Sequence, residues 1–225
     1  MPKAIAVVLS SGGLHSLVTA ALASREYRVA LLHLQDGRAP ARQAAAAFDR
    51  QVAHFKPFKS WSVELPYIRQ MSWPPETAGL VHSTGSDAYS NLVPLRDLQY
   101  LTIAAGFARQ IHASVILSGA QLDQKQSDAL ARHIEMVQIF NQMIELLSVE
   151  SPLTLKTPLM GLEDQQVIEL AYQMAAPLTA SWTCQMDLEF PCMSCPACAR
   201  RTRAFRAAQL ADPLTQKPSK QSVVA

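Results

Sequence analysis

The chain has 225 residues, 49% of them hydrophobic, and a formal net charge of +2. This length and composition exclude a disordered protein and predict a sizeable core, and the spread of the basic residues argues against a nucleic-acid surface. No run approaches the ~18 apolar residues of a membrane span and none reads as a signal peptide, so we expect a cytoplasmic protein in a reducing compartment.

Apolar runs alternate with helical patterns along the chain. We expect strands at residues 4–9, 29–34, 62–65 and 114–117. Helical periodicity marks residues 16–24, 41–55, 98–111, 127–147 and 167–174. The apolar face of the longest helix is expected at Leu130, Ile134, Val137, Ile144 and Leu147. This alternation predicts an α/β fold, in which helices cover a Rossmann-like parallel sheet and ligands bind at the carboxyl ends of the strands.

The remaining segments divide the chain. We expect residues 1–180 to form the α/β domain, residues 181–210 a small metal-binding segment, and residues 211–225 an unordered tail. Within the first part, residues 66–94 carry Pro74, Pro75 and Gly79 and follow no regular period. Long loops of this kind are usually functional, so we expect this excursion to lie near the site.

A glycine turn follows the first expected strand, where Ser10, Ser11, Gly12 and Gly13 precede a helical segment. Glycine lets the backbone come close to a ligand, and we expect Gly12 to lie where a phosphate approaches. The next helix points its unpaired N–H groups and positive dipole end into the turn, which favours phosphate or pyrophosphate. The turn matches neither the dinucleotide-binding glycine pattern nor the lysine-bearing phosphate loop. The alternative is a turn that only joins a strand to a helix.

All four cysteines lie within fifteen residues, at Cys184, Cys192, Cys195 and Cys198. Their C-x7-C-x2-C-x2-C spacing lets four thiolates surround one tetrahedral ion, and it predicts a structural zinc site without a catalytic role. An iron–sulfur cluster is the alternative, while disulfides are disfavoured in a reducing compartment. We expect the arginines that follow to face solvent, with acidic ligand groups as the alternative, namely Arg200, Arg201 and Arg203.

The Ser-Gly-Gly-x-x-Ser turn at residues 11–16 resembles the pyrophosphate loop of ATP pyrophosphatases. Together with the cysteines near the C-terminus, it makes the chain similar to the 7-cyano-7-deazaguanine synthase family, also called QueC or ExsB. Five further segments carry the resemblance in the same order and spacing, at residues 92–98, 116–120, 157–159, 181–184 and 198–205. The resemblance covers most of the chain and implies the Rossmann-like, HUP-like fold of the ATP pyrophosphatases.

The resemblance also implies a reaction. It implies an ATP-dependent ligase that converts 7-carboxy-7-deazaguanine and ammonia into the nitrile, on the pathway to queuosine. The implied ligands are ATP as cosubstrate, Mg²⁺, Zn²⁺ and a small-molecule substrate, with no nucleic-acid or membrane partner and with a homodimer as the candidate assembly. The residues expected to bind the nucleotide are Ser10, Ser11, Gly12, Gly13, Leu14, His15, Ser16, Gly37 and Gly119. Those expected to take part in catalysis are His15, Ser16 and Arg132.

Two positions and one segment depart from the family pattern. His15 stands where the family loop has aspartate, and Asp164 stands where the late helix of the family has lysine. Residues 35–40 keep only Gly37 of the family segment that follows the second strand. Imidazole does not carry the charge of a carboxylate, and loss of a cation next to pyrophosphate weakens the stabilisation of phosphate charge.

The segment expected to bind the substrate also differs. Residues 123–128 lack the tyrosines of the family loop and lead directly into a helix. Arg132 is in register there to bind a carboxylate, and the alternative is a solvated side chain on the helix surface. The family activity then needs a compensating cation, for which Arg38 and Lys125 are the candidates. The alternative is a diverged paralogue that keeps nucleotide and zinc binding but acts on another substrate or on none.

Overall fold

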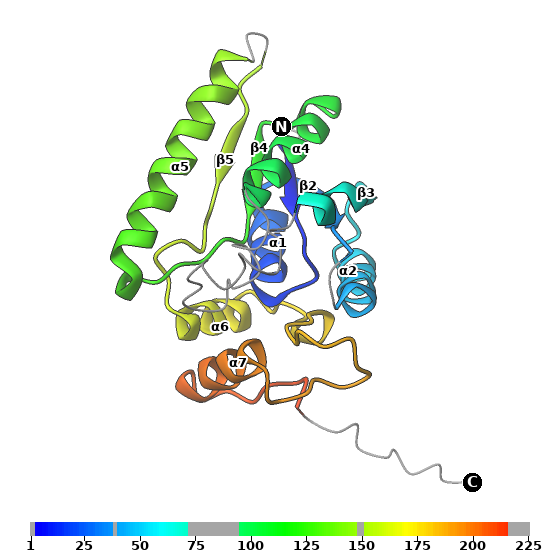
Figure 1. Ribbon diagram of the computed structural model, residues 1–225, viewed down its shortest axis with the longest axis vertical. Helices are drawn as coiled ribbons and strands as arrows, with labels where there is room; N and C mark the ends of the chain where they lie inside the picture. Colours follow the sequence, from blue (N-terminus) through cyan, green and yellow to red (C-terminus); the bar gives the residue numbers. More distant parts are fainter. Residues whose placement is uncertain (1–2, 38–39, 72–94, 148–150, 216–225) are drawn as a thin grey trace, which may run out of the picture.

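The computed structural model describes residues 3–37, 40–71, 95–147 and 151–215 (Figure 1). Within these residues five strands form one sheet in the order β3-β2-β1-β4-β5, and every neighbouring pair is parallel. The strands are β1 (Ile5–Leu9), β2 (Arg28–Gln35), β3 (Lys59–Glu64), β4 (Val115–Ser118) and β5 (Thr154–Lys156). The α-helices are α1 (Leu14–Glu26), α2 (Ala41–Phe55), α4 (Arg96–Gln110), α5 (Ser127–Leu146), α6 (Asp164–Gln173) and α7 (Pro196–Ala207). The α/β fold with a parallel sheet, expected from the sequence, is confirmed.

The two faces of the sheet are covered by different helices. On one face, Val7 and Ile116 belong to a core cluster with apolar residues of α4 and α5. On the other face, Ala6 and Val8 belong to a cluster with apolar residues of α1 and α2. Because side chains alternate along a strand and both faces are covered, the central strands are apolar at nearly every position.

Most predicted elements match the structure, and α2 has the bounds that its periodicity predicts. Two elements were not predicted, β5 and α7. Strand β5 has three residues, of which only Leu155 is buried, so it leaves almost no alternation to detect. Helix α7 is rich in arginine and begins with Pro196 inside the cysteine segment, where metal-site spacing dominates the sequence pattern.

The predicted apolar face of α5 is partly wrong. Ile134 is 43% exposed and Leu147 is 80% exposed, while Phe140 and Ile144 are buried. The physical reason is that α5 runs along the edge strand β5 and so contacts the sheet over a narrow strip. Asn141 completes this contact, because its side-chain amide accepts a hydrogen bond from the Leu155 N–H (2.7 Å) and donates one to the Leu155 carbonyl (3.1 Å).

The segment after residue 180 packs onto the sheet domain and shares its core. Leu14 and Leu17 of α1 lie in one cluster with Ala204 and Phe205 of α7. Figure 1 shows α6 and α7 side by side below the carboxyl ends of the strands. A short 3₁₀ helix, η4 (Leu178–Ala180), leads into this segment.

A buried ion pair closes the C-terminal segment. Arg201 donates to both carboxylate oxygens of Asp212, from Nε (2.7 Å) and Nη2 (2.9 Å), and also to the Ser181 hydroxyl (2.9 Å). The two side chains of the pair are only 5% and 7% exposed. The expectation that Arg201 faces solvent is therefore wrong, and its partner Asp212 belongs to the segment expected to form the tail. Arg203 is exposed as expected, and the chain beyond residue 215 lies outside the described ranges.

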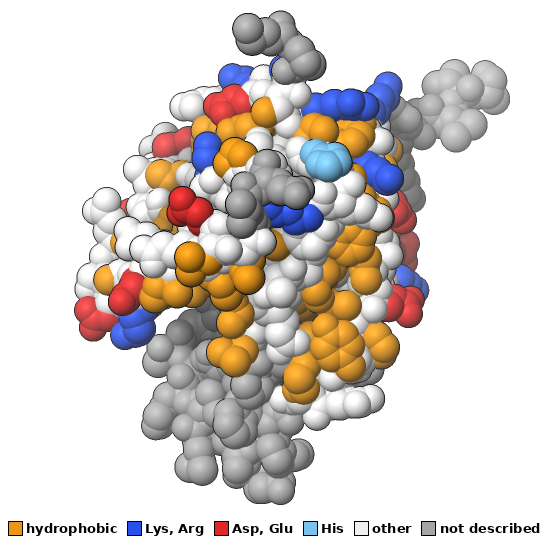
Figure 2. All heavy atoms as spheres, turned by 90° about the horizontal axis from the view of Figure 1, so that it is seen from above, with side chains coloured by type: hydrophobic (Ala, Val, Ile, Leu, Met, Phe, Trp, Pro, Cys, Tyr) orange, Lys and Arg blue, Asp and Glu red, His pale blue; other side chains and the backbone are white. Residues whose placement is uncertain are grey.

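The expected excursion at residues 66–94 is described only in part. Of the excursion at residues 66–94, the structure describes the 3₁₀ helix η1 (Pro66–Met71), and residues 72–94 lie outside the described ranges. Figure 2 shows the end of the molecule away from α6 and α7, where hydrophobic, basic and acidic side chains are intermixed. Among the described helices, none is long and apolar enough to cross a membrane.

The Arg201–Asp212 pair yields a stability prediction. We expect Asp212→Asn to lower the free energy of unfolding by about 3–5 kcal/mol, because Arg201 would remain buried without its counter-ion. Urea unfolding of the two proteins measures this difference. Arg203→Gln, on the exposed side of the same helix, is the control and should change the value by no more than about 0.5 kcal/mol. Equal stability of Asp212→Asn and the parent would show that the pair contributes little.

Candidate nucleotide site and cysteine cluster

A cavity of about 450 Å³ opens at the carboxyl ends of the strands. Its wall includes the loop between β1 and α1, Ser118 at the end of β4, and Thr157 just after β5. Residues of α4 and α5 also contribute, as does Trp182 from the C-terminal segment. The cavity therefore lies where the topology predicts a ligand, at the strand ends next to the first crossover.

The hydroxyl groups of the loop have different environments. Ser10 is 1% exposed, and its hydroxyl donates to Gln51 Oε1 of α2 (2.7 Å). The Ser11 and Ser16 hydroxyl oxygens lie 3.3 Å apart, and Ser16 donates to the Gly13 carbonyl (3.1 Å). Ser11 and Ser16 are thus the hydroxyls placed beside the start of α1, whereas the hydroxyl of Ser10 ties the loop to α2.

Gly12 is required by packing against α2. It has a φ of +77°, and a Cβ atom built there would lie 2.4 Å from the Ala44 carbonyl oxygen. The Trp182 N–H donates to the Gly12 carbonyl (2.8 Å) and holds the turn from the C-terminal side. Gly13 lies on the cavity wall. The missing side chain of Gly12 therefore makes room for Ala44, and its expected place beside a phosphate stays a prediction.

Gly119 and Gly37 lie at the ends of the neighbouring strands. A Cβ atom at Gly119 would lie 2.8 Å from the Ser16 nitrogen, so glycine allows the start of α1 to reach the end of β4. Gly119 also lines the cavity. Gly37 is exposed after β2 and follows the buried Asp36. Only the first of these two glycines is brought to the cavity wall.

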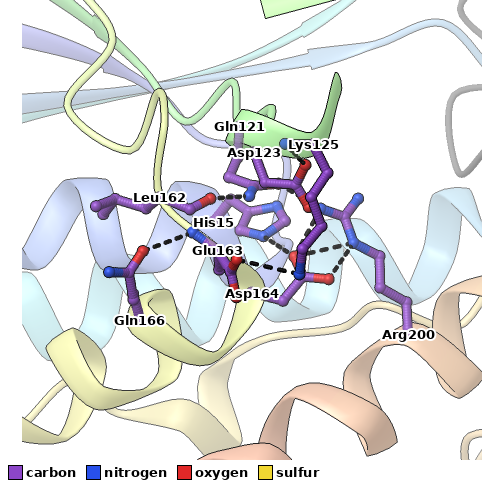
Figure 3. A network of polar contacts seen from close by, with 9 residues as sticks. All are labelled: His15, Gln121, Asp123, Lys125, Leu162, Glu163, Asp164, Gln166 and Arg200. Carbon is purple, nitrogen blue, oxygen red and sulfur yellow. Dashed lines mark hydrogen bonds and ion pairs between the residues drawn. The ribbon is translucent and has the colours of Figure 1, made fainter. Parts of the chain in front are cut away.

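The two charge departures of the sequence meet in space (Figure 3). His15 Nε2 lies 4.0 Å from an Asp164 carboxylate oxygen. Arg200 of α7 donates to both oxygens of Asp164, from Nε (3.0 and 2.8 Å) and Nη2 (2.6 Å), and Nη2 also donates to Gln121. Positions 15 and 164 thus form one contact, and the Asp164 charge is balanced by Arg200.

This arrangement corrects two expectations. Arg200 was expected to face solvent, but it forms a bidentate ion pair with Asp164. Lys125 was a candidate for the compensating cation near the loop, but it pairs with Glu163 (3.1 Å) at an exposed position. The other candidate, Arg38, lies outside the described residues. Arg200 is the cation that the structure places next to His15 and Asp164.

The environment of His15 keeps its imidazole neutral near pH 7. Enclosure by the surrounding protein, and then the positive charge of Arg200, lower the pKa of His15 to about 4, although the Asp164 carboxylate opposes this. A second cavity of about 210 Å³ lies on the Asp164 side of the histidine and shares Leu14, His15 and Thr183 with the first. His15 therefore presents an uncharged ring between two cavities.

The residues of α4 and α5 on the cavity wall were missed by the sequence analysis. Arg96 and Tyr100 of α4 line the cavity, as does His133 of α5. Arg132, the residue expected to bind a carboxylate, lies on the exposed side of α5 instead. Arg96 belongs to a segment quoted for the family resemblance, which is the one signal that points to it. Tyr100 and His133 carry no sequence signal, because their positions depend on helix packing.

The sulfur atoms of the four cysteines in the sequence motif lie close together. Their Sγ atoms are all within 4.8 Å of one another, and Cys192 and Cys198 are 4.0 Å apart. Tetrahedral coordination with Zn–S bonds of about 2.3 Å places sulfurs ~3.8 Å apart, so the group fits a single ion. All four cysteines are free thiols, so no disulfide competes for them.

Backbone N–H groups surround the sulfurs. Cys184 Sγ accepts from the N–H groups of Met186 (3.4 Å) and Cys192 (3.3 Å), and Cys195 Sγ accepts from that of Cys198 (3.4 Å). The N–H groups of Ser194 and then Cys195 lower the pKa of the Cys192 thiol to about 6. These donors favour thiolate, which is the form that binds a metal.

The described features define a class of protein. A parallel sheet whose first crossover loop is a glycine turn under a cavity, followed by a four-cysteine cluster, is the architecture expected of the ATP-pyrophosphatase-like enzymes. The family model described as "Queuosine biosynthesis protein QueC" matches residues 5–209 of this chain. The chain therefore belongs to the QueC family.

Curated relatives agree with this assignment. A 7-cyano-7-deazaguanine synthase of Chlorobium phaeobacteroides (strain BS1) is 30% identical over 216 residues, which cover 93% of this chain and 95% of the relative. The 7-cyano-7-deazaguanine synthase of Acidobacterium capsulatum is 30% identical over 220 residues with the same coverage. The family-model match at residues 5–209 includes both the glycine loop and the cysteine cluster.

One solved structure shares the fold. The U34-tRNA thiolase NcsA of Methanococcus maripaludis, described with its [4Fe-4S] cluster, superposes with a TM-score of 0.51 and 14% sequence identity. The superposition covers 92% of this chain, which spans 65% of the length of that thiolase. At this identity the similarity shows the fold alone.

The low pKa of His15 yields a pH prediction. Between about pH 6.5 and pH 4 the unfolded chain binds more protons at this histidine than the folded chain, so the free energy of unfolding falls as the pH falls through this window. His15→Asn should make that decline shallower, whereas His112→Asn at an exposed position should not. His33, whose pKa is also lowered by burial, keeps part of the decline in both variants. Denaturant unfolding at several pH values provides the test, and identical slopes for His15→Asn and the parent would contradict it.

Proposed function

We propose that this chain is an ATP-dependent ligase of the 7-cyano-7-deazaguanine synthase type. The observation that carries the proposal is the glycine loop at the start of α1, which opens onto the main cavity in a chain of the QueC family. The substrates would be 7-carboxy-7-deazaguanine, ammonia and two molecules of ATP. The product would be the nitrile that serves queuosine biosynthesis.

The chemistry replaces oxygen by nitrogen in two activated steps. A carboxylate oxygen attacks the α-phosphorus of ATP and expels pyrophosphate, and ammonia then displaces AMP to form the amide. The amide oxygen attacks a second ATP in the same way, and loss of AMP and a proton leaves the nitrile. The protein would mainly align the groups and stabilise charge on the phosphate oxygens.

The loop residues have distinct parts in this proposal. The N–H groups of the first turn of α1, from Leu14 to Ser16, would bind the phosphates, because they have no partner within the helix. The Ser11 and Ser16 hydroxyls would add hydrogen bonds at the same place. Mg²⁺ would be held by the phosphates of the nucleotide and would screen their charge. Arg132 stays a predicted substrate residue from sequence alone, and its exposure gives it no support.

The alternative of a diverged paralogue is not favoured by the comparisons. It rested on the charges at positions 15 and 164, on residues 35–40 and on the substrate loop at residues 123–128. The first two positions are parts of one contact with Arg200, while the other two differences from the family pattern remain. A binding module without adenylating activity would predict ATP binding with no exchange of pyrophosphate.

We propose zinc as the ion of the cysteine cluster, with a structural role. The four-cysteine group fits metal binding, and the zinc would be held by Cys184, Cys192, Cys195 and Cys198. The proposal extends to a reducing, cytoplasmic location, to a homodimer, and to a small molecule rather than a nucleic acid as the partner. Four thiolates without an open position would hold the fold together and would do no chemistry.

The loop is tested with two glycine variants. Gly13→Val adds a side chain to the cavity wall, where a Cβ atom would lie 3.1 Å from the Ser11 hydroxyl, and should weaken ATP binding at least ~10-fold with little change in melting temperature. Gly12→Ala should instead lower the melting temperature, because its Cβ atom meets Ala44. Calorimetry with ATP and carboxylate-dependent exchange of ATP and pyrophosphate are the measurements. Equal ATP affinity in Gly13→Val and the parent would remove the loop from the proposed site.

The metal proposal has its own measurement. Elemental analysis should find one zinc per chain, and Cys195→Ser should lower both the metal content and the melting temperature because metal binding contributes to folding. Chelation of the parent should lower the melting temperature in the same direction, and added zinc should restore it. Finding iron with acid-labile sulfide would show an iron–sulfur cluster in place of zinc. Freely titratable thiols in the folded chain would show that the cysteines hold no metal.

A further inference from the structure

The cavity wall formed by α4 carries a nearly buried cation. The Arg96 side chain is only 12% exposed, although it lies at the first position of the helix. Its guanidinium carbon lies 5.5 Å from the centre of the Tyr100 ring, one helical turn further on. Both residues line the cavity that the glycine loop also lines. A guanidinium on an aromatic ring within about 6 Å gains a favourable cation–π interaction, so the cation is held in place.

Tyr100 is itself held from the sheet. Its hydroxyl donates to a carboxylate oxygen of Asp36 (2.7 Å), and Asp36 is only 6% exposed directly after β2. A charge-assisted hydrogen bond to a buried carboxylate is among the stronger ones in proteins. The ring therefore provides a fixed support for Arg96. Such prior ordering reduces the entropy lost when a ligand binds.

Among the described residues, Asp97 forms an exposed ion pair with Arg96. Both Nε (3.1 Å) and Nη2 (3.0 Å) of Arg96 donate to a single oxygen of Asp97. The Asp97 side chain is 61% exposed, so water competes for its carboxylate. Exposed ion pairs typically contribute no more than about 1 kcal/mol. An incoming ligand with two anionic oxygens can replace Asp97 and offer the guanidinium its preferred bidentate geometry.

We propose that Arg96 binds the carboxylate of the acceptor substrate, which competes with the neighbouring Asp97 for the guanidinium. Tyr100 holds the guanidinium at the wall, and apolar side chains of the same wall, Leu101 and Met136, contact a planar heteroaromatic ring. The ligand class is a planar aromatic carboxylate, and the residue takes the place that sequence reasoning assigned to Arg132. This inference rests on the proposed function, because the glycine loop must hold the nucleotide that the carboxylate attacks.

The alternative source of anionic oxygens is the nucleotide phosphate, and the experiment separates the two. Calorimetry measures the Kd of 7-carboxy-7-deazaguanine and the Kd of ATP separately for the parent and for Arg96→Gln. We expect the carboxylate Kd to rise ~10–100-fold, as for loss of a charged hydrogen-bonding partner, and the ATP Kd to change less than about threefold. A rise confined to the ATP Kd would overturn the proposal and assign Arg96 to the phosphates.

Three further variants sharpen the test. Asp97→Asn should lower the carboxylate Kd about two- to fivefold, because it removes a weak competing anion from Arg96. Arg96→Lys keeps the positive charge but lacks the bidentate guanidinium. Its carboxylate Kd should lie between those of the parent and Arg96→Gln. Arg50→Gln, on the exposed side of α2, is the matched control and should bind as the parent does. A loss of carboxylate binding in Arg132→Gln with none in Arg96→Gln would overturn the proposal.

Unfolding of a variant and failure of the proposed function can each be distinguished from failure of the Arg96 proposal. Should Arg96→Gln unfold, as seen by circular dichroism, Asp97→Asn and Arg96→Lys carry the test, and unchanged carboxylate Kd values in both would overturn the proposal. Failure of the proposed function would appear as absent carboxylate-dependent pyrophosphate exchange in the parent. The binding comparison stays decisive in that case, because a carboxylate Kd that depends on Arg96 supports the site and one that does not overturns it.

Discussion

The close contact between Gly12 and Ala44 is the constraint on which the site depends. A Cβ atom at Gly12 would lie 2.4 Å from the Ala44 carbonyl oxygen, so no other residue fits without moving α2. The same glycine accepts a hydrogen bond from the Trp182 N–H, and Trp182 packs with Cys184 and Cys198. The turn is therefore fixed from α2 on one side and from the cysteine segment on the other. A metal that orders the cysteines would stabilise this support for the loop.

Charge around the loop is arranged by proximity in space. His15 and Asp164 are far apart in the chain, and each looks unfavourable when it is compared alone with the aspartate and lysine of the family. In the fold they touch, and Arg200 from a third element balances the carboxylate. Electrostatic energy depends on the distance between charges and on the dielectric around them, so Arg200 of α7 neutralises the carboxylate that α6 places beside the loop.

Much of the fold could be predicted because its signals are local. The apolar runs of β1 and β2 and the periodicity of α2 lie within a few residues each, and the cysteine spacing is local too. The short strand β5 and the helix α7 could not be predicted, since one is stabilised by pairing with β4 and the other by packing on α6. Burial of Arg201 depends on Asp212, and neither residue alone shows that the other lies beside it.

The candidate site divides in the same way. The glycine loop was found because one short segment supplies most of it, although the reason for Gly12 became clear only from its contact with α2. The wall residues Arg96 and Tyr100 come from α4, and Asp36 supports them from the segment after β2, through a hydrogen bond and a cation–π contact. The glycine loop can therefore be recognised from sequence, whereas the proposed acceptor wall is assembled only in the folded chain. Members of one family can for this reason share the loop chemistry while differing in the residues that hold the acceptor.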